Sequence, residues 1–239
     1  MKEQNRLSDP NITMDNATHT YTLATHPELE FISVTTLVAE FFKPFDKERI
    51  ANKLVTTIPK YFGRSPESLI AEWNAAGKHG TIVHKEIEDW INERIEPKER
   101  KAIAGKNWVN SYKMKMDVDI LTEVMVYSKE LRIAGTIDIL SRDNEKGEYQ
   151  IIDWKTSKRI DKDSFNGRVG TRPPTRTVTD CNFNHYALQL SLYRYLLEEY
   201  YGIIVNNQLI AHLQDYGTKN YHTPYMRDHI IEMLKIDLK

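Results

Sequence analysis

The sequence predicts an α/β (α+β) fold, in which a central mixed β-sheet is flanked by helices and preceded by an N-terminal helical region. Three features support this prediction. Residues 65–118 show the periodicity of helices. Residues 121–153 contain three short apolar segments separated by turn-forming residues, which is typical of an antiparallel meander. A long helical pattern at residues 183–201 and one more strand at residues 205–213 complete the core.

Length and composition fit one domain spanning residues 1–239. The 239 residues are 40% apolar and 28% charged, and no apolar run is long enough to cross a membrane. The polar N-terminus lacks the apolar core of a secretory signal, so we expect a cytoplasmic monomer in a bacterium or a phage-infected host. The single cysteine, Cys181, excludes an internal disulfide and a four-cysteine iron–sulfur cluster. The net charge of −1 disfavours a coating protein for nucleic acid more than an enzyme.

The first elements follow from polarity and caps. Residues 1–18 are polar, and we expect them to be flexible. Ser33 or Thr35 is placed to cap a helix that runs through residues 38–42, and a further helix covers residues 46–54. Short strands are predicted at residues 20–23 and 29–32.

The helical region begins with a strong start signal. Ser65 suits the N-cap and Pro66 the first helical position, and the helix is predicted to run to Ala76. The segment from Gly77 to Gly80 is expected to end it. Further helices are predicted at residues 81–93 and 98–116.

The core is predicted within residues 119–213. A long irregular loop, residues 156–182, follows the meander and carries several basic side chains, and loops of this length are usually functional or disordered. Gly202 ends the long helix, and a last helix starts at Pro224. The meander strands are predicted at residues 121–127, 133–141 and 149–153.

The segment Asp153-Trp154-Lys155 follows a buried apolar pair at the end of the third meander strand. Because side chains alternate along a strand, Asp153 and Lys155 point to the same face. Asp138 lies in the preceding strand, so the two acids are expected to be neighbours across the sheet. Alone, each acid also fits a surface salt bridge or a turn.

Four more side chains extend this set, although each by itself is better explained by a packing or surface role. His84 lies on a predicted helix, Gln189 and Tyr193 share one helix face, and Glu123 lies in the strand before Asp138. Together, two carboxylates and a histidine suit Mg²⁺ or Mn²⁺, and a lysine beside them can orient an attacking water. This combination suits the hydrolysis of a phosphodiester.

The order of these residues resembles the PD-(D/E)XK nuclease superfamily, and more narrowly its RecB-like exonuclease branch, which includes mitochondrial genome-maintenance and phage exonucleases. The family pattern of GxxxH, GxxD, D/ExK and QxxxY reads here as Gly80 to His84, Gly135 to Asp138, Asp153 to Lys155, and Gln189 to Tyr193. The resemblance covers residues 80–195 and implies a restriction-endonuclease-like core. It does not extend to the cluster-forming cysteines of some members.

The resemblance also implies a role for each residue. Asp138, Asp153, His84 and the backbone carbonyl of Trp154 would bind Mg²⁺ or Mn²⁺, with Glu123 as an accessory ligand. Lys155 would be the catalytic lysine. The remaining motif residues, Gln189 and Tyr193, would hold the DNA strand or Lys155.

In relatives that act on free ends, N-terminal helices cover a single strand of DNA, and here residues 65–118 are the candidate. Trp108 or Tyr112 would stack on bases and the basic loop 156–182 would add phosphate contacts, although an ordinary solvated helix explains this region equally well. The basic side chains concerned are Lys98, Arg100, Lys101, Lys106, Lys113 and Lys115.

We therefore expect a metal-dependent DNA exonuclease that acts on single-stranded ends in recombination, repair or phage DNA processing, with a recombination or helicase partner. One alternative is a structure- or site-specific endonuclease on the same fold. The other is a non-catalytic nucleic-acid-binding accessory protein that keeps the fold without the activity.

Overall fold

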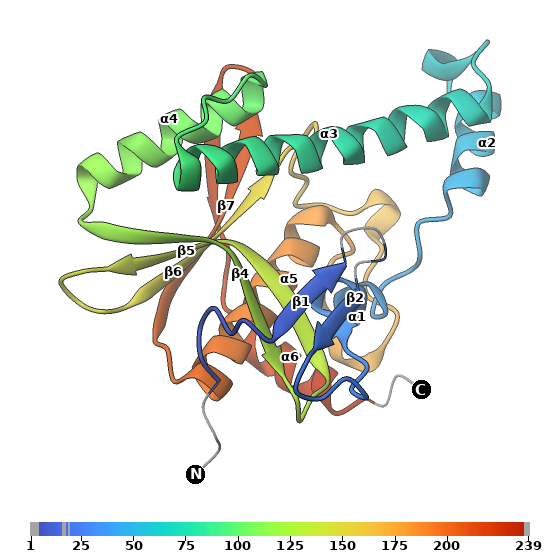
Figure 1. Ribbon diagram of the computed structural model, residues 1–239. Helices are drawn as coiled ribbons and strands as arrows, with labels where there is room; N and C mark the ends of the chain where they lie inside the picture. The colour runs from blue at the N-terminus through green and yellow to red at the C-terminus, as the bar shows by residue number, and fades with distance from the viewer. Residues whose placement is uncertain (1–4, 16–17, 19, 237–239) are drawn as a thin grey trace.

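The computed structural model describes residues 5–15, 18 and 20–236 and confirms the mixed α/β architecture (Figure 1). Within these residues, a six-stranded mixed sheet lies between two layers of helices. Its strands are β3 (Ile32–Ser33), β4 (Val118–Ser128), β5 (Ile133–Asp143), β6 (Tyr149–Lys155), β7 (Val205–Gln214) and β8 (Gly217–His222).

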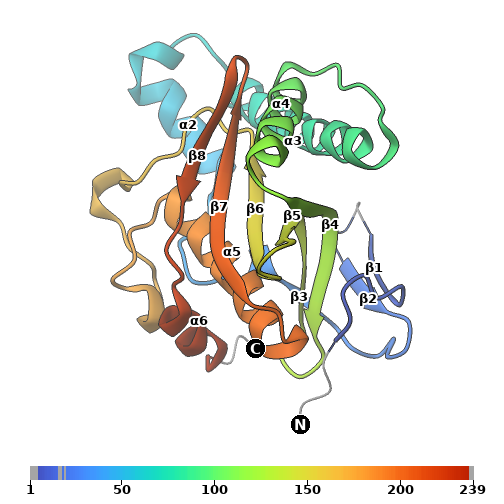
Figure 2. The ribbon, with the colours of Figure 1, turned by 90° about the vertical axis from the view of Figure 1, so that its left-hand side faces the viewer.

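The helices cover both faces of the sheet (Figure 2). Ile151 packs against the layer on one face and Ile152 against the layer on the other, and both side chains are fully buried. This alternation places β6 in the middle of the core. One layer consists of α1 (Val34–Ala39), α5 (Asn182–Tyr201) and α6 (Arg227–Leu234), and the other of α3 (Pro66–Glu93) and α4 (Arg100–Lys115).

The predicted meander is confirmed, and its strands are longer than predicted. β4, β5 and β6 pair antiparallel, while β7 runs parallel to β6 because α5 carries the chain back across the sheet. β8 adds an antiparallel edge strand that the sequence did not predict. Its exposed Lys219 and Asn220 give it the polar character of a loop.

β5 and β6 form a fork. Their ladder runs from the Arg142–Tyr149 pair to the Ile139–Ile152 pair and goes no further. Beyond this point β6 continues beside β7, whereas the start of β5 pairs with β3. The residues just past the last rung therefore have no strand partner across the fork, and Asp138 and Asp153 are the first of them.

The predicted break at Gly77 to Gly80 is wrong, because α3 runs through it without interruption. A glycine costs a helix only about 1 kcal/mol. The buried side chains of Val83, Ile87 and Trp90 outweigh this cost. Ile82, in contrast, is 50% exposed.

The expectation that residues 1–18 are flexible is wrong for residues 12–15, which form β1 (Ile12–Asp15) and pair with β2 (Thr20–Leu23). Ile12 is buried, and Asp9 accepts a hydrogen bond from the Tyr127 hydroxyl at 2.7 Å. Residues 1–4, 16 and 17 of this stretch lie outside the described residues. The strand predicted at residues 29–32 shrinks to β3, and Ser33 caps α1 by accepting from the Thr36 amide.

A projecting arm, residues 43–74, joins α1 to the body of α3 (Figure 1). It contains α2 (Lys47–Thr57), the short η1 turn (Pro59–Tyr61) and the first residues of α3. The Asp46 carboxylate caps α2, and Lys47 donates to the Asn74 side chain at 2.7 Å, which fixes α2 against α3.

The long loop 156–182 is ordered by contacts with α1. Thr175 donates to the Phe41 carbonyl at 3.1 Å, and Arg172 donates to the Glu40 carbonyl at 2.8 Å. Two short 3₁₀ turns, η2 (Phe165–Gly167) and η3 (Pro173–Thr175), lie within the loop.

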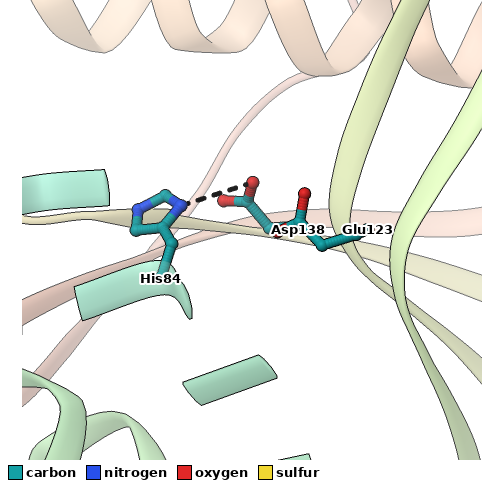
Figure 3. Close-up of side chains that lie close together, drawn as sticks. All are labelled: His84, Glu123 and Asp138. Carbon is teal, nitrogen blue, oxygen red and sulfur yellow. Dashed lines mark ion pairs between the residues drawn. The ribbon is translucent and has the colours of Figure 1, made fainter. Parts of the chain in front are cut away.

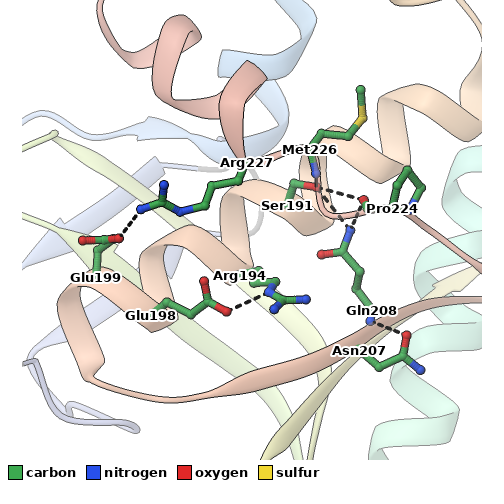
Figure 4. Close-up of polar contacts among 9 residues, drawn as sticks. All are labelled: Ser191, Arg194, Glu198, Glu199, Asn207, Gln208, Pro224, Met226 and Arg227. Carbon is green, nitrogen blue, oxygen red and sulfur yellow. Dashed lines mark hydrogen bonds and ion pairs between the residues drawn. The ribbon is translucent and has the colours of Figure 1, made fainter.

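A buried polar cluster fixes the chain before α6 (Figure 4). Gln208 on β7 donates to the Pro224 carbonyl at 2.7 Å, and Ser191 on α5 accepts from the Met226 amide at 3.0 Å. These bonds hold residues 224–226 outside the helix, so α6 begins at Arg227 rather than at Pro224. Among the helices in the described part of the chain, none has the length and hydrophobicity needed to cross a bilayer.

Candidate active site

The fork between β5 and β6 brings the predicted site residues together. Asp138 comes from β5, and Asp153 and Lys155 come from β6. Glu123 reaches the site from β4, His84 from α3, and Gln189 from α5. Every helix layer and three adjacent strands thus contribute to one small volume.

Asp153 and Lys155 form the buried half of the site. The Lys155 Nζ lies 2.6 Å from Asp153 Oδ2, as expected for two residues that share a strand face. The Gln189 amide donates to Asp153 Oδ1 at 3.2 Å. Asp153 is only 3% exposed, and the Lys155 ammonium group is the partner of its Oδ2.

His84, Glu123 and Asp138 form the more open half (Figure 3). Their ligand atoms all lie within 4.8 Å of one another, and His84 Nδ1 is 3.6 Å from Asp138 Oδ1. Two carboxylates and one imidazole converging in this way are a suitable donor set for Mg²⁺ or Mn²⁺. Asp153 is not part of this three-residue group; its carboxylate faces Lys155 and Gln189.

The Trp154 amide occupies the fork. It donates to Asp138 Oδ2 at 2.7 Å, so a side chain supplies the acceptor that a neighbouring strand would otherwise provide. This bond fixes the carboxylate of Asp138 relative to β6. The metal-binding role expected for the Trp154 carbonyl stays a prediction.

The pKa values of the two strand acids, Asp138 and Asp153, are shifted in opposite directions. Burial raises the pKa of Asp153 to about 6, and this effect exceeds the lowering by Lys155. Burial also acts on Asp138, but there the attraction of His84 is reinforced by Lys155 and by the Trp154 amide, and the pKa falls below its ordinary value. Although burial opposes it, Asp138 raises the pKa of His84. Asp138 is therefore ionised in the metal-free site at neutral pH.

Glu123 is held in a strained conformation. Thr122 pairs with Ile139 and Val124 pairs with Ile137, so Glu123 stands opposite Asp138 across the two strands. Its φ is +48°, in the left-handed region, which is rare inside a strand and costs about 1–3 kcal/mol. Such strain is often found at functional sites. Here the strained residue carries a carboxylate that converges with the side chains of His84 and Asp138.

Two motif glycines make room for the site. A Cβ atom on Gly135 would lie 2.6 Å from the Tyr193 ring and 2.9 Å from Val34, and one on Gly80 would lie 2.9 Å from the Thr156 hydroxyl. Tyr193 is buried, and burial raises its pKa well above 10. Its ring therefore supports β5 from below rather than facing solvent.

Tyr186 is a site residue that the sequence interpretation missed. The Lys155 Nζ lies 4.6 Å from the centroid of its ring, which is a cation–π distance. Tyr186 precedes Gln189 by three residues and Tyr193 by seven, so all three lie on one face of α5. The helix face predicted for Gln189 and Tyr193 includes Tyr186 when it is extended by one turn toward the start of the helix.

The expectation that Trp108 or Tyr112 stacks on bases is wrong. Their rings stack on each other at 5.0 Å, and Trp108 packs edge-on against Trp154. The Trp108 indole donates to Asn220, and the Tyr112 hydroxyl donates to Gln150. Both rings are committed to the contact between α4 and the sheet.

The raised pKa of Glu123 predicts a pH-dependent stability of the metal-free protein. Burial and the nearby Asp138 raise this pKa from 4.5 to about 8. The folded state favours the protonated carboxyl. Its contribution to the free energy of unfolding is therefore complete below pH 4.5 and is lost as pH rises through 8. Between pH 6 and 9, we expect wild type to lose about 2–3 kcal/mol more than Glu123→Gln does. Denaturant titrations in EDTA measure this, and equal losses in both proteins would contradict it.

Known proteins share the sequence pattern of this chain at the level of a superfamily. A family model of the PD-(D/E)XK nuclease superfamily matches residues 64–222, a range that includes every candidate site residue. No curated protein matches the chain. Among solved structures, the chain is similar to SSO0001, with 14% sequence identity and a TM-score of 0.38 over 86% of this chain and 75% of that chain. From the extent of the family match, the chain belongs to the PD-(D/E)XK nuclease superfamily.

Proposed function

We propose that the protein is a metal-dependent DNA exonuclease of the RecB-like branch, acting on single-stranded ends in recombination, repair or phage DNA processing. The observation that carries this proposal is the pairing of the His84–Glu123–Asp138 group with the buried Asp153–Lys155 ion pair. A metal-ligand set and a lysine at the same strand end are what phosphodiester hydrolysis needs.

His84, Glu123 and Asp138 would hold a Mg²⁺ or Mn²⁺ ion, and Asp153 is the further ligand that the family resemblance implies. The ion would supply a Lewis acid for the phosphate group. The donor set fits this role because carboxylate oxygens are hard ligands and because the ligand atoms of His84, Glu123 and Asp138 all lie within 4.8 Å of one another.

Lys155 orients the attacking water and offsets the negative charge that develops on the phosphate. Asp153 and the Tyr186 ring hold its ammonium group from two sides, at 2.6 Å and 4.6 Å. Gln189 in turn holds Asp153. Lys155 is therefore preorganised by groups that do not themselves touch the substrate.

In this proposal, the contacts that link the arm, α3 and the loop support exonuclease action over endonuclease action. The Glu72 carboxylate on α3 accepts from Arg64 and from Lys158 of the loop, both at 2.9 Å. At its other end the loop is tied to α1 through Arg172. The arm, α3 and the loop are thus linked to one another, and in this proposal a strand that passes between them enters by a free end.

The test is a panel of substrates with purified protein in Mg²⁺ or Mn²⁺. We expect degradation of end-labelled linear single strands, slower attack on blunt duplex, and no attack on circular single strands. Chelation by EDTA should remove all activity. Cleavage of circles at the linear rate would favour the endonuclease alternative, and the absence of any cleavage would favour the accessory-protein alternative. The labelled end also reports polarity.

A further inference from the structure

The projecting arm differs from the rest of the chain in charge. Residues 43–74 contain six lysine or arginine residues and four acidic ones, in a protein whose net charge is −1. The neighbouring loop, residues 156–182, has six basic residues against three acidic ones. The two segments are joined by the Lys158–Glu72 contact. A polyanion is the partner that this concentration of positive charge attracts.

The arm also exposes aromatic rings, which monomeric proteins rarely leave in solvent as a group. Phe45 is 62% exposed and Phe62 is 58% exposed. Phe45 packs edge to face against Trp73, with ring centroids 5.4 Å apart. Exposed aromatic rings among basic side chains are the recognition elements of unpaired nucleic acid, because every base offers a face to stack on.

The geometry of α3 links this aromatic pair to the active site. At about 100° per residue, Trp73, Gly77 and His84 lie within about 40° of one another around the helix axis. A Cβ atom on Gly77 would meet nothing within 4 Å, whereas one on Gly80, about one turn nearer His84, would lie 2.9 Å from the Thr156 hydroxyl. This side of the helix is therefore open at Gly77 and bordered by the loop at Gly80. Trp73 and His84 are about 16 Å apart along the axis.

We propose that Phe45 and Trp73 form a base-stacking site for a single strand, which runs from there along the Gly77 side of α3 to His84. This inference rests on the proposed nuclease function and assigns the strand path for it. At about 3.4 Å per stacked nucleotide, the path spans about five nucleotides. The arm therefore contacts only substrates that are long enough to extend from His84 to Phe45 and Trp73.

The first experiment measures binding without cleavage. Fluorescein-labelled (dT)15 is titrated in EDTA with wild type, Phe45→Ala, Trp73→Leu and the control Tyr216→Ala, whose ring is 94% exposed on the hairpin between β7 and β8. We expect the first two variants to bind about 5- to 100-fold more weakly and the control to bind as wild type does. Unchanged binding of Phe45→Ala, or equal weakening for blunt duplex, would overturn the stacking site.

A second variant tests the path itself and does not risk unfolding. Gly77→Leu places a side chain in open space and raises helix propensity. We expect a higher KM for (dT)15, with a smaller effect on oligonucleotides shorter than about five nucleotides. An equal effect at all lengths, or none, would contradict the path. If wild type binds (dT)15 but cleaves nothing, the nuclease proposal fails while the binding result still decides the stacking site.

Discussion

Replacing Lys155 with alanine is expected to lower kcat for single-stranded DNA by about 10²–10³-fold or more. The ammonium group is the only cation within hydrogen-bond distance of Asp153 among the described ion pairs, and it lies at the strand end where the phosphate would bind. Asp153→Ala should have an effect of similar size, because it removes both the partner of Lys155 and a candidate metal ligand. Initial rates on an end-labelled strand in Mg²⁺ measure both.

Loss of activity must be separated from loss of fold. Without Lys155, the buried Asp153 lacks its ion-pair partner, and breaking a buried pair costs about 3–5 kcal/mol. Thermal unfolding and near-ultraviolet circular dichroism should therefore accompany the rates. Lys146→Ala, in the exposed turn between β5 and β6, is the matched control and should keep full activity. Wild-type rates in both Lys155→Ala and Asp153→Ala would refute the assignment.

Gly135→Ala is expected to destabilise the fold by about 1–3 kcal/mol, the usual cost of overpacking a core. The new methyl group would lie 2.6 Å from the Tyr193 ring and 2.9 Å from Val34, and all three positions are enclosed by the sheet and by two helices. Either β5 or the Tyr193 ring must move. Because Asp138 lies three residues along the same strand, activity should fall together with stability.

Gly77→Ala is expected to have the opposite effect on the free energy of unfolding. Its new methyl group meets nothing within 4 Å, and alanine favours a helix interior by about 1 kcal/mol over glycine. Its free energy of unfolding, from urea titrations, should rise by about 0.5–1 kcal/mol. A Gly135→Ala protein as stable as wild type would show that the Tyr193 contact is not tight.

Strong local patterns allowed the sequence to predict the meander, the long helix α5 and the parallel strand β7. What it missed depended on tertiary contacts. The glycines in α3 suggested a break, but the buried stripe around Ile87 carries the helix through them. β1 forms because Ile12 finds a place beside Tyr127 and Ala134, which no local pattern indicates.

The chemistry and order of the site residues allowed them to be predicted from the sequence. Their division into two groups could not be predicted in this way. The fork separates Asp138, which faces His84 and Glu123, from Asp153, which faces Lys155. This depends on where the β5–β6 ladder ends. The left-handed conformation of Glu123, which stands opposite Asp138, likewise has no signal in the residue type.

The fork has a consequence for the synthesis of the protein. Its polar contacts join His84 on α3 to Asp138 on β5, and Asp153 on β6 to Gln189 on α5. Contacts between residues so distant in sequence form only after long loops have closed. A chain still emerging from the ribosome before α5 therefore lacks Gln189, which donates to Asp153. In such a chain, the carboxylate beside Lys155 has not yet received its contact from the layer of helices that contains α5.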